Sequence, residues 1–152
     1  MSQAQDKSDD PLASIKGRLN ALGFELTPLR KLVLSLLVEA KAPVKAYDLL
    51  EAARSHGQRL TAASVYRVLD FFRDRGLVHR VNALNAFVVC NDDEPTGGHH
   101  PLIVVCPDCG KTTEINDGTL TENLLAGLNA LGHTVKMVSV EVHGLCRGCA
   151  GK

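Results

Sequence analysis

The sequence predicts an α+β protein, with a helical first half that ends in a β-hairpin and a smaller α/β second half. Helical spacing of apolar residues dominates up to Gly76, and two short strand-like runs follow it. Paired cysteines flank further strand-like runs near the end of the chain. We expect three regions: a disordered polar arm over residues 1–11, a first domain over 12–83 and a second domain over 84–152.

The composition allows a folded core and gives no sign of a membrane segment. Of the 152 residues, 45% are hydrophobic and 22% are charged, and this length suits one domain or two small ones. The longest apolar runs, such as residues 102–106, are far too short to cross a bilayer. The start, MSQAQDKSDDP, lacks the pattern of a signal peptide. We therefore expect a cytoplasmic protein with no membrane partner.

The charges are distributed unevenly, although the formal net charge is zero. Residues 1–82 carry 13 Lys and Arg against 9 Asp and Glu, a balance of +4. Residues 83–152 carry 4 against 8, a balance of −4. A positive first half would suit an anionic partner, but a merely solvated surface explains an excess of this size about as well.

Three helices are expected before Gly57. The first ends at Gly23, where the helical spacing stops. The second begins after Thr27, which can cap a helix, with Pro28 at the first helical position, and Pro43 ends its apolar stripe. The apolar positions of the three helices are, in turn, Leu12, Ile15, Leu19 and Leu22; Leu29, Leu32, Val33, Leu36, Leu37 and Ala40; Ala46, Leu49, Leu50 and Ala53.

The fourth helical segment, TAASVYRVLDFFRDRG, is the candidate DNA-reading element. Arg67 points away from its apolar face and Tyr66 lies on the flank of that face. A guanidinium can bridge O6 and N7 of guanine, and an aromatic ring can contact a thymine methyl group, so this pair would suit a major groove. The alternative is an amphipathic helix whose Arg67 is only solvated. The apolar positions are Val65, Val68, Leu69 and Phe72.

Two strand-like runs, LVHRVN and AFVVC, follow Gly76 on either side of a turn at residues 83–85. Three helices followed by a β-hairpin is the order of a winged helix-turn-helix domain. This order favours DNA over solvent for the outward face of the fourth helical segment.

Cys106, Cys109, Cys146 and Cys149 form two Cys-x2-Cys pairs, each at the end of a strand-like run. In a reducing cytosol they are not expected to form disulfides. Two such pairs offer the four thiolates that tetrahedral Zn²⁺ needs, and the 36 residues between them leave room for a helix and a strand. We predict a structural zinc site, with redox-active pairs or unrelated turns as the alternatives. Because protein ligands fill every position, no open position remains for catalysis.

The remaining candidate ligands are His79, Cys90, His99, His100 and Glu114. Each has an ordinary structural explanation, since His79 shares a strand face with apolar residues and Cys90 could be a small core residue. A set of histidine, cysteine and glutamate donors would make a credible tetrahedral Zn²⁺ site. Sequence spacing alone does not establish that these residues converge.

Five motifs occur in the order seen in repressors of the ferric uptake regulator family: LTPLR, SVYRVLDF, LVHRVN…FVVC, CPDCG and HGLCRGC. Across residues 12 to 150, the chain resembles the zinc uptake regulator branch of that family. The resemblance implies a homodimer, with a winged helix that reads operator DNA and a C-terminal dimerisation domain. It also implies one structural and one regulatory Zn²⁺ per subunit.

The resemblance assigns roles residue by residue. The spacing of seven before Cys106 favours His99 over His100 as a ligand. The implied ligands of structural zinc are Cys106, Cys109, Cys146 and Cys149; those of regulatory zinc are His79, Cys90, His99 and Glu114; the implied DNA contacts are Tyr66, Arg67 and Arg30.

The expected function is therefore zinc-responsive repression of zinc uptake and homeostasis genes, with no enzymatic activity and no small-molecule substrate. One alternative is a sensor of iron, manganese, nickel or peroxide on the same fold, although the Cys90 thiolate prefers softer ions than manganese. A second alternative is a zinc-ribbon module that binds only protein. A zinc hydrolase or deaminase would need an H-E-x-x-H or H-x-E…P-C-x-x-C pattern, and the sequence has neither.

Overall fold

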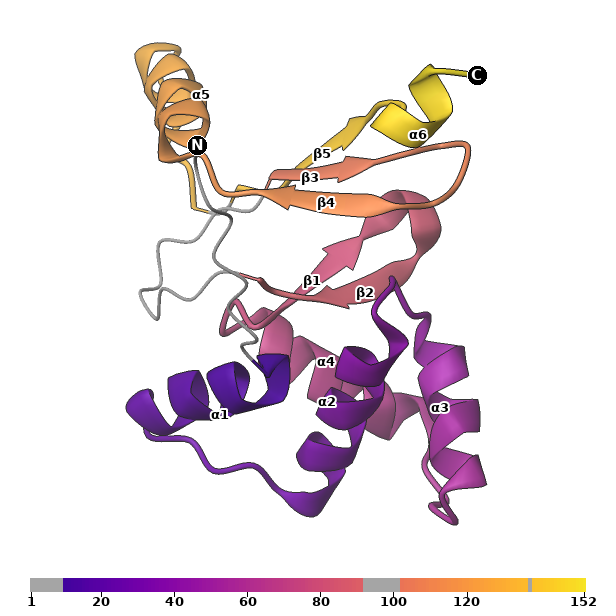
Figure 1. Cartoon of the computed structure of the whole chain (residues 1–152). Coiled ribbons are helices and arrows are strands. Elements are labelled where there is room, and N and C mark those ends of the chain that lie inside the picture. Colours follow the sequence, from indigo (N-terminus) through magenta and orange to yellow (C-terminus); the bar gives the residue numbers. More distant parts are fainter. Residues whose placement is uncertain (1–9, 92–101, 137) are drawn as a thin grey trace, which may run out of the picture.

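The structure, a computed structural model, describes residues 10–91, 102–136 and 138–152 (Figure 1). Within these residues, four helices precede a two-stranded hairpin, and a three-stranded sheet with two further helices follows it. The predicted α+β class is confirmed. The elements are α1 (Pro11–Ala21), α2 (Pro28–Ala40), α3 (Ala46–Ser55), α4 (Ala62–Arg73), β1 (Val78–Val81), η1 (Asn82–Leu84), β2 (Ala86–Val89), β3 (Leu102–Val105), β4 (Thr112–Ile115), α5 (Gly118–Ala130), β5 (Val140–His143) and α6 (Arg147–Ala150).

The ends of the first two helices follow from local chemistry. Thr27 accepts a hydrogen bond from the backbone N–H of Arg30 at 3.3 Å, which is the predicted cap of α2 and is worth about 1 kcal/mol. Leu22 is 43% exposed although its spacing predicted burial, because α1 ends at Ala21 and the chain turns at Gly23 with a positive φ of 76°.

The first half buries one continuous core beneath α1 to α4. Leu34 belongs to it as well, although the predicted stripe of α2 omitted this residue. Phe87 of β2 joins the same core and ties the hairpin to the helices. The other fully buried side chains of this half include Ile15, Leu19, Val33, Leu49, Val65, Leu69, Phe72, Leu77 and Val78.

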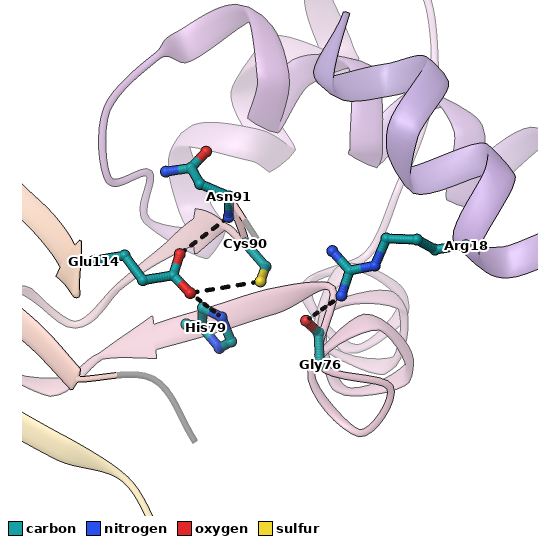
Figure 2. Close-up of polar contacts among 6 residues, drawn as sticks. All are labelled: Arg18, Gly76, His79, Cys90, Asn91 and Glu114. Atoms are coloured by element: carbon teal, nitrogen blue, oxygen red, sulfur yellow. Dashed lines mark hydrogen bonds and ion pairs between the residues drawn. The ribbon is translucent and has the colours of Figure 1, made fainter. Parts of the chain in front are cut away.

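The hairpin packs closely against the helical half. β1 and β2 are antiparallel, and β2 also bridges to Val44, whose N–H and C=O both bond Phe87. Arg18 of α1 is only 7% exposed, and its Nη2 donates to the carbonyl of Gly76 at 3.1 Å (Figure 2). This bond fixes the junction between α4 and β1. The hairpin and the helices are therefore joined by backbone bonds, a buried arginine and a shared core.

The second half is a mixed sheet in the order β4-β3-β5. β3 is antiparallel to β4 and parallel to β5, and α5 provides the crossover that a parallel connection needs. In Figure 1, α5 stands at one end of this sheet and extends away from it. None of the described residues of α5 is buried, although an apolar stripe of Leu120, Leu124 and Leu128 runs along the helix. The exposed large apolar residues of this half are Ile115, Leu120, Leu124, Leu131, Val142 and Leu145.

The hairpin lies between the helices and the three-stranded sheet (Figure 1). Val81 of β1, Ile103 and Val105 of β3 form a second, small core between the two sheets. The expected domain boundary after residue 83 falls inside the hairpin, because β2 pairs with β1 rather than with the second sheet.

The expected arm over residues 1–11 overlaps the start of α1. Asp10 caps this helix by accepting a hydrogen bond from the N–H of Leu12 at 3.0 Å, and Pro11 is the first helical residue. Residues 1–9 lie outside the described part of the chain. Among the described helices, none is long and apolar enough to cross a membrane.

Candidate metal centres and nucleic-acid-binding face

The two cysteine pairs meet at one edge of the second sheet. Cys106 directly follows β3 and Cys146 lies just beyond β5, and because these strands are parallel neighbours their carboxyl ends lie side by side. The N–H of Gly144 donates to the carbonyl of Val105 at 3.0 Å and holds the two strand ends together. Gly110, with φ of 72°, closes the first turn, and its N–H bonds the carbonyl of Cys106.

The four sulfur atoms lie close enough together to share one zinc ion. All four ligand atoms lie within 4.8 Å of one another, and Sγ of Cys109 is 3.7 Å from Sγ of Cys146. Four thiolates bound at 2.3 Å around one Zn²⁺ would stand about 3.8 Å apart. The cluster therefore fits zinc in donor type, number and spacing, as the sequence predicted.

The electrostatics of the cluster also favour a cation. Hydrogen bonds to the backbone of Cys146 and then of Cys109 lower the pKa of the Cys106 thiol to about 6. The thiol of Cys146, followed by those of Cys106 and Cys109, raises the pKa of Cys149 to about 12. The first thiol ionises easily and the last resists, because without a positive charge between them the sulfur atoms cannot share several negative charges.

A second group of donors forms where the hairpin meets the second sheet (Figure 2). It joins His79 of β1, Cys90 beyond β2 and Glu114 of β4, with their ligand atoms within 4.8 Å of one another. In the hairpin register Cys90 stands opposite Leu77, since its N–H bonds the carbonyl of that residue. Cys90 and His79 therefore lie on the same face, one step apart along neighbouring strands.

Glu114 is the centre of this group. Its Oε1 is 3.3 Å from Nε2 of His79 and accepts a hydrogen bond from Sγ of Cys90 at 3.5 Å. Its Oε2 accepts the backbone N–H of Asn91 at 3.0 Å (Figure 2). The side chains of His79 and Glu114 are only 9% and 6% exposed. Three predicted ligands from both halves of the chain thus converge in a nearly closed space.

The distances in this group fit a shared zinc ion. With bonds of 2.0 to 2.3 Å, tetrahedral geometry places a nitrogen and an oxygen about 3.4 Å apart and a sulfur and an oxygen about 3.6 Å apart. A buried thiolate and a buried carboxylate are compatible at this range only with a proton or a cation between them. The two other predicted candidates, His99 and His100, lie outside the described residues.

The predicted DNA-reading pair lies on α4, about one turn after the start of the helix. Thr61 and Ser64 form a capping box there, each side chain bonding the other's backbone N–H at 3.1 Å. Arg67 is exposed, as its position on the helix predicted. Tyr66 is half-buried and its ring meets that of Phe87 edge-on at 6.5 Å, so its orientation is fixed by the hairpin.

Arg30, the third implied DNA contact, packs against an aromatic ring of α4. Its guanidinium stacks on the ring of Phe71 at 3.5 Å from the centroid. Arg75 stacks on the same ring at 3.6 Å and on Phe24 at 4.0 Å. The guanidinium of Arg30 is therefore held in place by α4 rather than extending freely into solvent.

Three further residues of possible functional importance, Arg54, Arg59 and Glu141, were not identified from the sequence. Arg54 and Arg59 line a hollow of about 430 Å³ between α3 and α4, and arginines beside that connection could have been noticed as phosphate contacts. Glu141 of β5 lies beneath the hairpin turn, with a side chain only 15% exposed. Sequence spacing gives no signal for this contact, because its partners are 58 and 59 positions away.

The two faces of β5 differ in exposure. Val142 is 42% exposed, whereas the side chain of Glu141 is only 15% exposed. The polar face packs on the hairpin, while the apolar face of the sheet is left uncovered in the single chain.

Comparison with known proteins now decides the family. The model of the ferric uptake regulator family matches residues 21–143. The chain belongs to that family. Its members are regulators of transcription, and the expectation that the chain is not an enzyme is confirmed. The zinc uptake regulation protein of Escherichia coli (strain K12) is 35% identical over 127 residues, which cover 82% of this chain and 72% of the relative.

Solved structures support the zinc uptake branch of the family. A zinc uptake regulator complexed with zinc and DNA matches with a TM-score of 0.84 at 27% identity, over 97% of each chain. Holo XcZur matches with a TM-score of 0.81 at 35% identity, over 93% of this chain and 97% of its own. Apo XcZur, at 34% identity and covering 93% of this chain and 99% of its own, reaches only 0.53. The structure as a whole is therefore more similar to these holo and DNA-bound proteins than to apo XcZur.

Proposed function

We propose that this protein is a zinc-responsive transcriptional repressor that binds operator DNA as a homodimer and controls genes of zinc uptake and homeostasis. The observation that carries the proposal is the convergence of His79, Cys90 and Glu114 from opposite sides of the boundary between the hairpin and the second sheet. Because these ligands belong to different halves, occupancy of the site is linked to the orientation of one half relative to the other.

Each subunit holds two zinc ions in this proposal. The structural ion is bound by Cys106, Cys109, Cys146 and Cys149. The regulatory ion is bound by His79, Cys90, Glu114 and His99, with His100 as the alternative to His99. When bound, zinc supplies the positive charge and the four-coordinate geometry that these donors lack on their own.

The protein side chains perform the switching. Without a cation, Glu114 is a buried carboxylate beside a buried thiol, and the two can separate by moving the hairpin away from the sheet. With their charge compensated, the same residues favour the closed arrangement described here. The greater likeness to holo than to apo XcZur supports this assignment. The coupling is reciprocal, so operator DNA should tighten zinc binding.

In the closed arrangement α4 is presented for DNA. The first domain extends to the end of the hairpin at Val89 in this proposal, and its Tyr66 and Arg67 contact base edges. Arg30, stacked on Phe71, provides a pre-oriented cation for a phosphate.

The second domain provides the dimer interface. The outer face of its sheet and the apolar stripe of α5 are uncovered in the single chain, and a second copy of the chain would bury both. The dimer sets the distance between two copies of α4, so that they reach successive major grooves.

Operator binding at buffered concentrations of free Zn²⁺, Fe²⁺, Mn²⁺ and Ni²⁺ tests the proposal. Fragments selected from genomic DNA supply the operator, and wild type is compared with Cys90→Ser. We expect Zn²⁺ to induce tight binding at the lowest free concentration and Cys90→Ser to abolish the response. A normal response by Cys90→Ser would refute the regulatory site. Equal DNA affinity at every metal concentration would refute metal-responsive repression itself.

A further inference from the structure

Two glutamates flank one buried residue on the inner face of the second sheet. Ile103 of β3 stands opposite Glu114 in β4 and opposite Glu141 in β5. The three side chains form one row across the sheet and point to the same side, because residues in register share a face. Ile103 packs against Val81 of the hairpin. The two carboxylates therefore approach the hairpin on either side of an apolar contact.

The carboxylates contact opposite ends of the hairpin. Glu114 lies at the open end, with His79, Cys90 and Asn91. Glu141 lies at the turn, where its Oε2 accepts the N–H of Asn82 at 2.7 Å and its Oε1 accepts the N–H of Ala83 at 2.8 Å. Both are short hydrogen bonds to a carboxylate, the stronger kind of protein hydrogen bond.

A neighbour on its own strand also contacts Glu141. Nε2 of His143, two residues along β5 and on the same face, is 3.2 Å from Oε1 of Glu141. Glu141 belongs to neither group of metal-ligand candidates among the described residues. Its bonds to the turn are made by the protein alone.

A single attachment point does not fix the orientation of one body on another. The ligand group at Glu114 and the non-directional apolar contact of Ile103 with Val81 would still leave the hairpin, and the helices packed on it, able to pivot on the sheet. A second attachment beyond Ile103 removes this freedom. We propose that Glu141 is a positioning residue for the zinc response: it anchors the hairpin turn so that zinc binding at Glu114 yields a single orientation of the DNA-reading domain. This role rests on the function proposed above.

The test compares Glu141→Gln with Glu39→Gln. Glutamine keeps the length of the side chain but presents an amide N–H₂ to one of the two backbone N–H groups, so one hydrogen bond is lost. Glu39, exposed on α2, makes the control with the same change of charge. We measure the ratio of operator affinity with saturating zinc to that without zinc. Loss of one charge-assisted bond should lower this ratio about tenfold for Glu141→Gln and leave it unchanged for Glu39→Gln.

Amide hydrogen exchange measured by NMR reports the contact itself. In the zinc-loaded dimer, Glu141→Gln should accelerate exchange at Asn82 and Ala83 about tenfold, while Asn91, which bonds Glu114, changes less. Glu141→Asp is the second variant. It keeps the charge but is too short to reach both amides, so it should reduce the ratio in the same direction.

The outcomes separate this proposal from the one on which it rests. Zinc content and melting temperature are recorded for every variant. If wild type responds to zinc, and the Glu141 variants lose stability but keep the wild-type affinity ratio, then Glu141 is merely structural and the inference is wrong. Unprotected amides at Asn82 and Ala83 in zinc-loaded wild type would also overturn it. If wild type itself shows no zinc response, the proposed function fails and the positioning role fails with it.

Discussion

The two groups of metal-ligand candidates differ in where their donors come from. The four cysteines of the cluster lie in the second half, just after the neighbouring parallel strands β3 and β5. His79, Cys90 and Glu114 come from both sides of the contact between the hairpin and the second sheet. A site within one folded unit stabilises that unit, whereas a site that spans two units responds to their relative position. This difference is why we assign a permanent role to the first and a regulatory role to the second.

The largest effect is expected from Cys106→Ser. Loss of one thiolate from the cysteine cluster should release its zinc, and structural zinc of this type contributes about 10–16 kcal/mol of apparent binding energy. We expect the second half to unfold at a much lower temperature and the dimer to weaken, measured by calorimetry and analytical ultracentrifugation.

Cys90→Ser is the matched control for Cys106→Ser, since it removes one thiolate from the other site. It should lower the zinc content from two per subunit to one and leave the dimer intact. If both variants unfold to the same extent, the distinction between a structural and a regulatory site is wrong.

His79→Ala should abolish zinc-dependent operator binding while the cysteine cluster stays loaded. The loss of one ligand of four in a nearly closed site should weaken regulatory zinc at least 100-fold, which is seen as a shift in the free zinc needed for DNA binding. His133→Ala is the control, because His133 is exposed beyond α5. An unchanged zinc response in His79→Ala would contradict the account in which the site joins the two halves.

Arg67→Ala separates DNA reading from zinc sensing. We expect operator affinity to fall by about 1–3 kcal/mol, measured by fluorescence anisotropy, because a guanidinium contact to a guanine edge is lost. Zinc content should remain at two per subunit. Arg73→Ala removes an arginine from the far end of the same helix, where it pairs with Asp70 and Asp74, and serves as control. An equal loss in both variants would mean that the effect is one of general charge.

The smallest effect concerns protons at the cysteine cluster. The pKa of Cys106 is lowered to about 6, so in the zinc-free fold this thiol is already ionised at pH 7.5. Its contribution to the stability of the fold is complete above the ordinary pKa of 9.0 and is lost as the pH falls through 6. Cys149, with a pKa of about 12, still carries its proton. Loading zinc at pH 7.5 should therefore release distinctly fewer than the nearly four protons expected of four ordinary thiols. Titration calorimetry in buffers of different ionisation enthalpy measures this number, and a release of four would contradict the lowered pKa of Cys106.

Local signals predicted most of the first half. The start of α2 is marked by Thr27 and Pro28, and the end of α3 is marked by Gly57. Both signals are local, because capping and chain reversal depend on neighbours in the sequence. The cysteine pairs were equally readable, since each pair is a local motif. The composition of the regulatory group came from resemblance rather than from spacing.

Contacts between the halves that belong to no motif could not be predicted from the sequence. The position of Glu141 under the hairpin turn depends on the register of β3 with β5, which no local pattern fixes. For the same reason the sequence does not show which face of β5 is exposed: alternation shows that a strand has two faces, but which face the molecule covers depends on the assembly.

The parallel pairing of β3 with β5 has a consequence for how the molecule folds. β3 and β4 form a local hairpin that carries the first cysteine pair, whereas β5 can join only after the chain has returned past α5. Closing such a long loop is slow, because its entropy is lost before the new contacts compensate. The first cysteine pair, Cys106 and Cys109, can bind a metal ion through two sulfur atoms before β5 has joined the sheet. A bound ion would then speed the pairing of the second cysteine pair with the first. Metal supply would then set the rate of maturation as well as the activity of the finished protein.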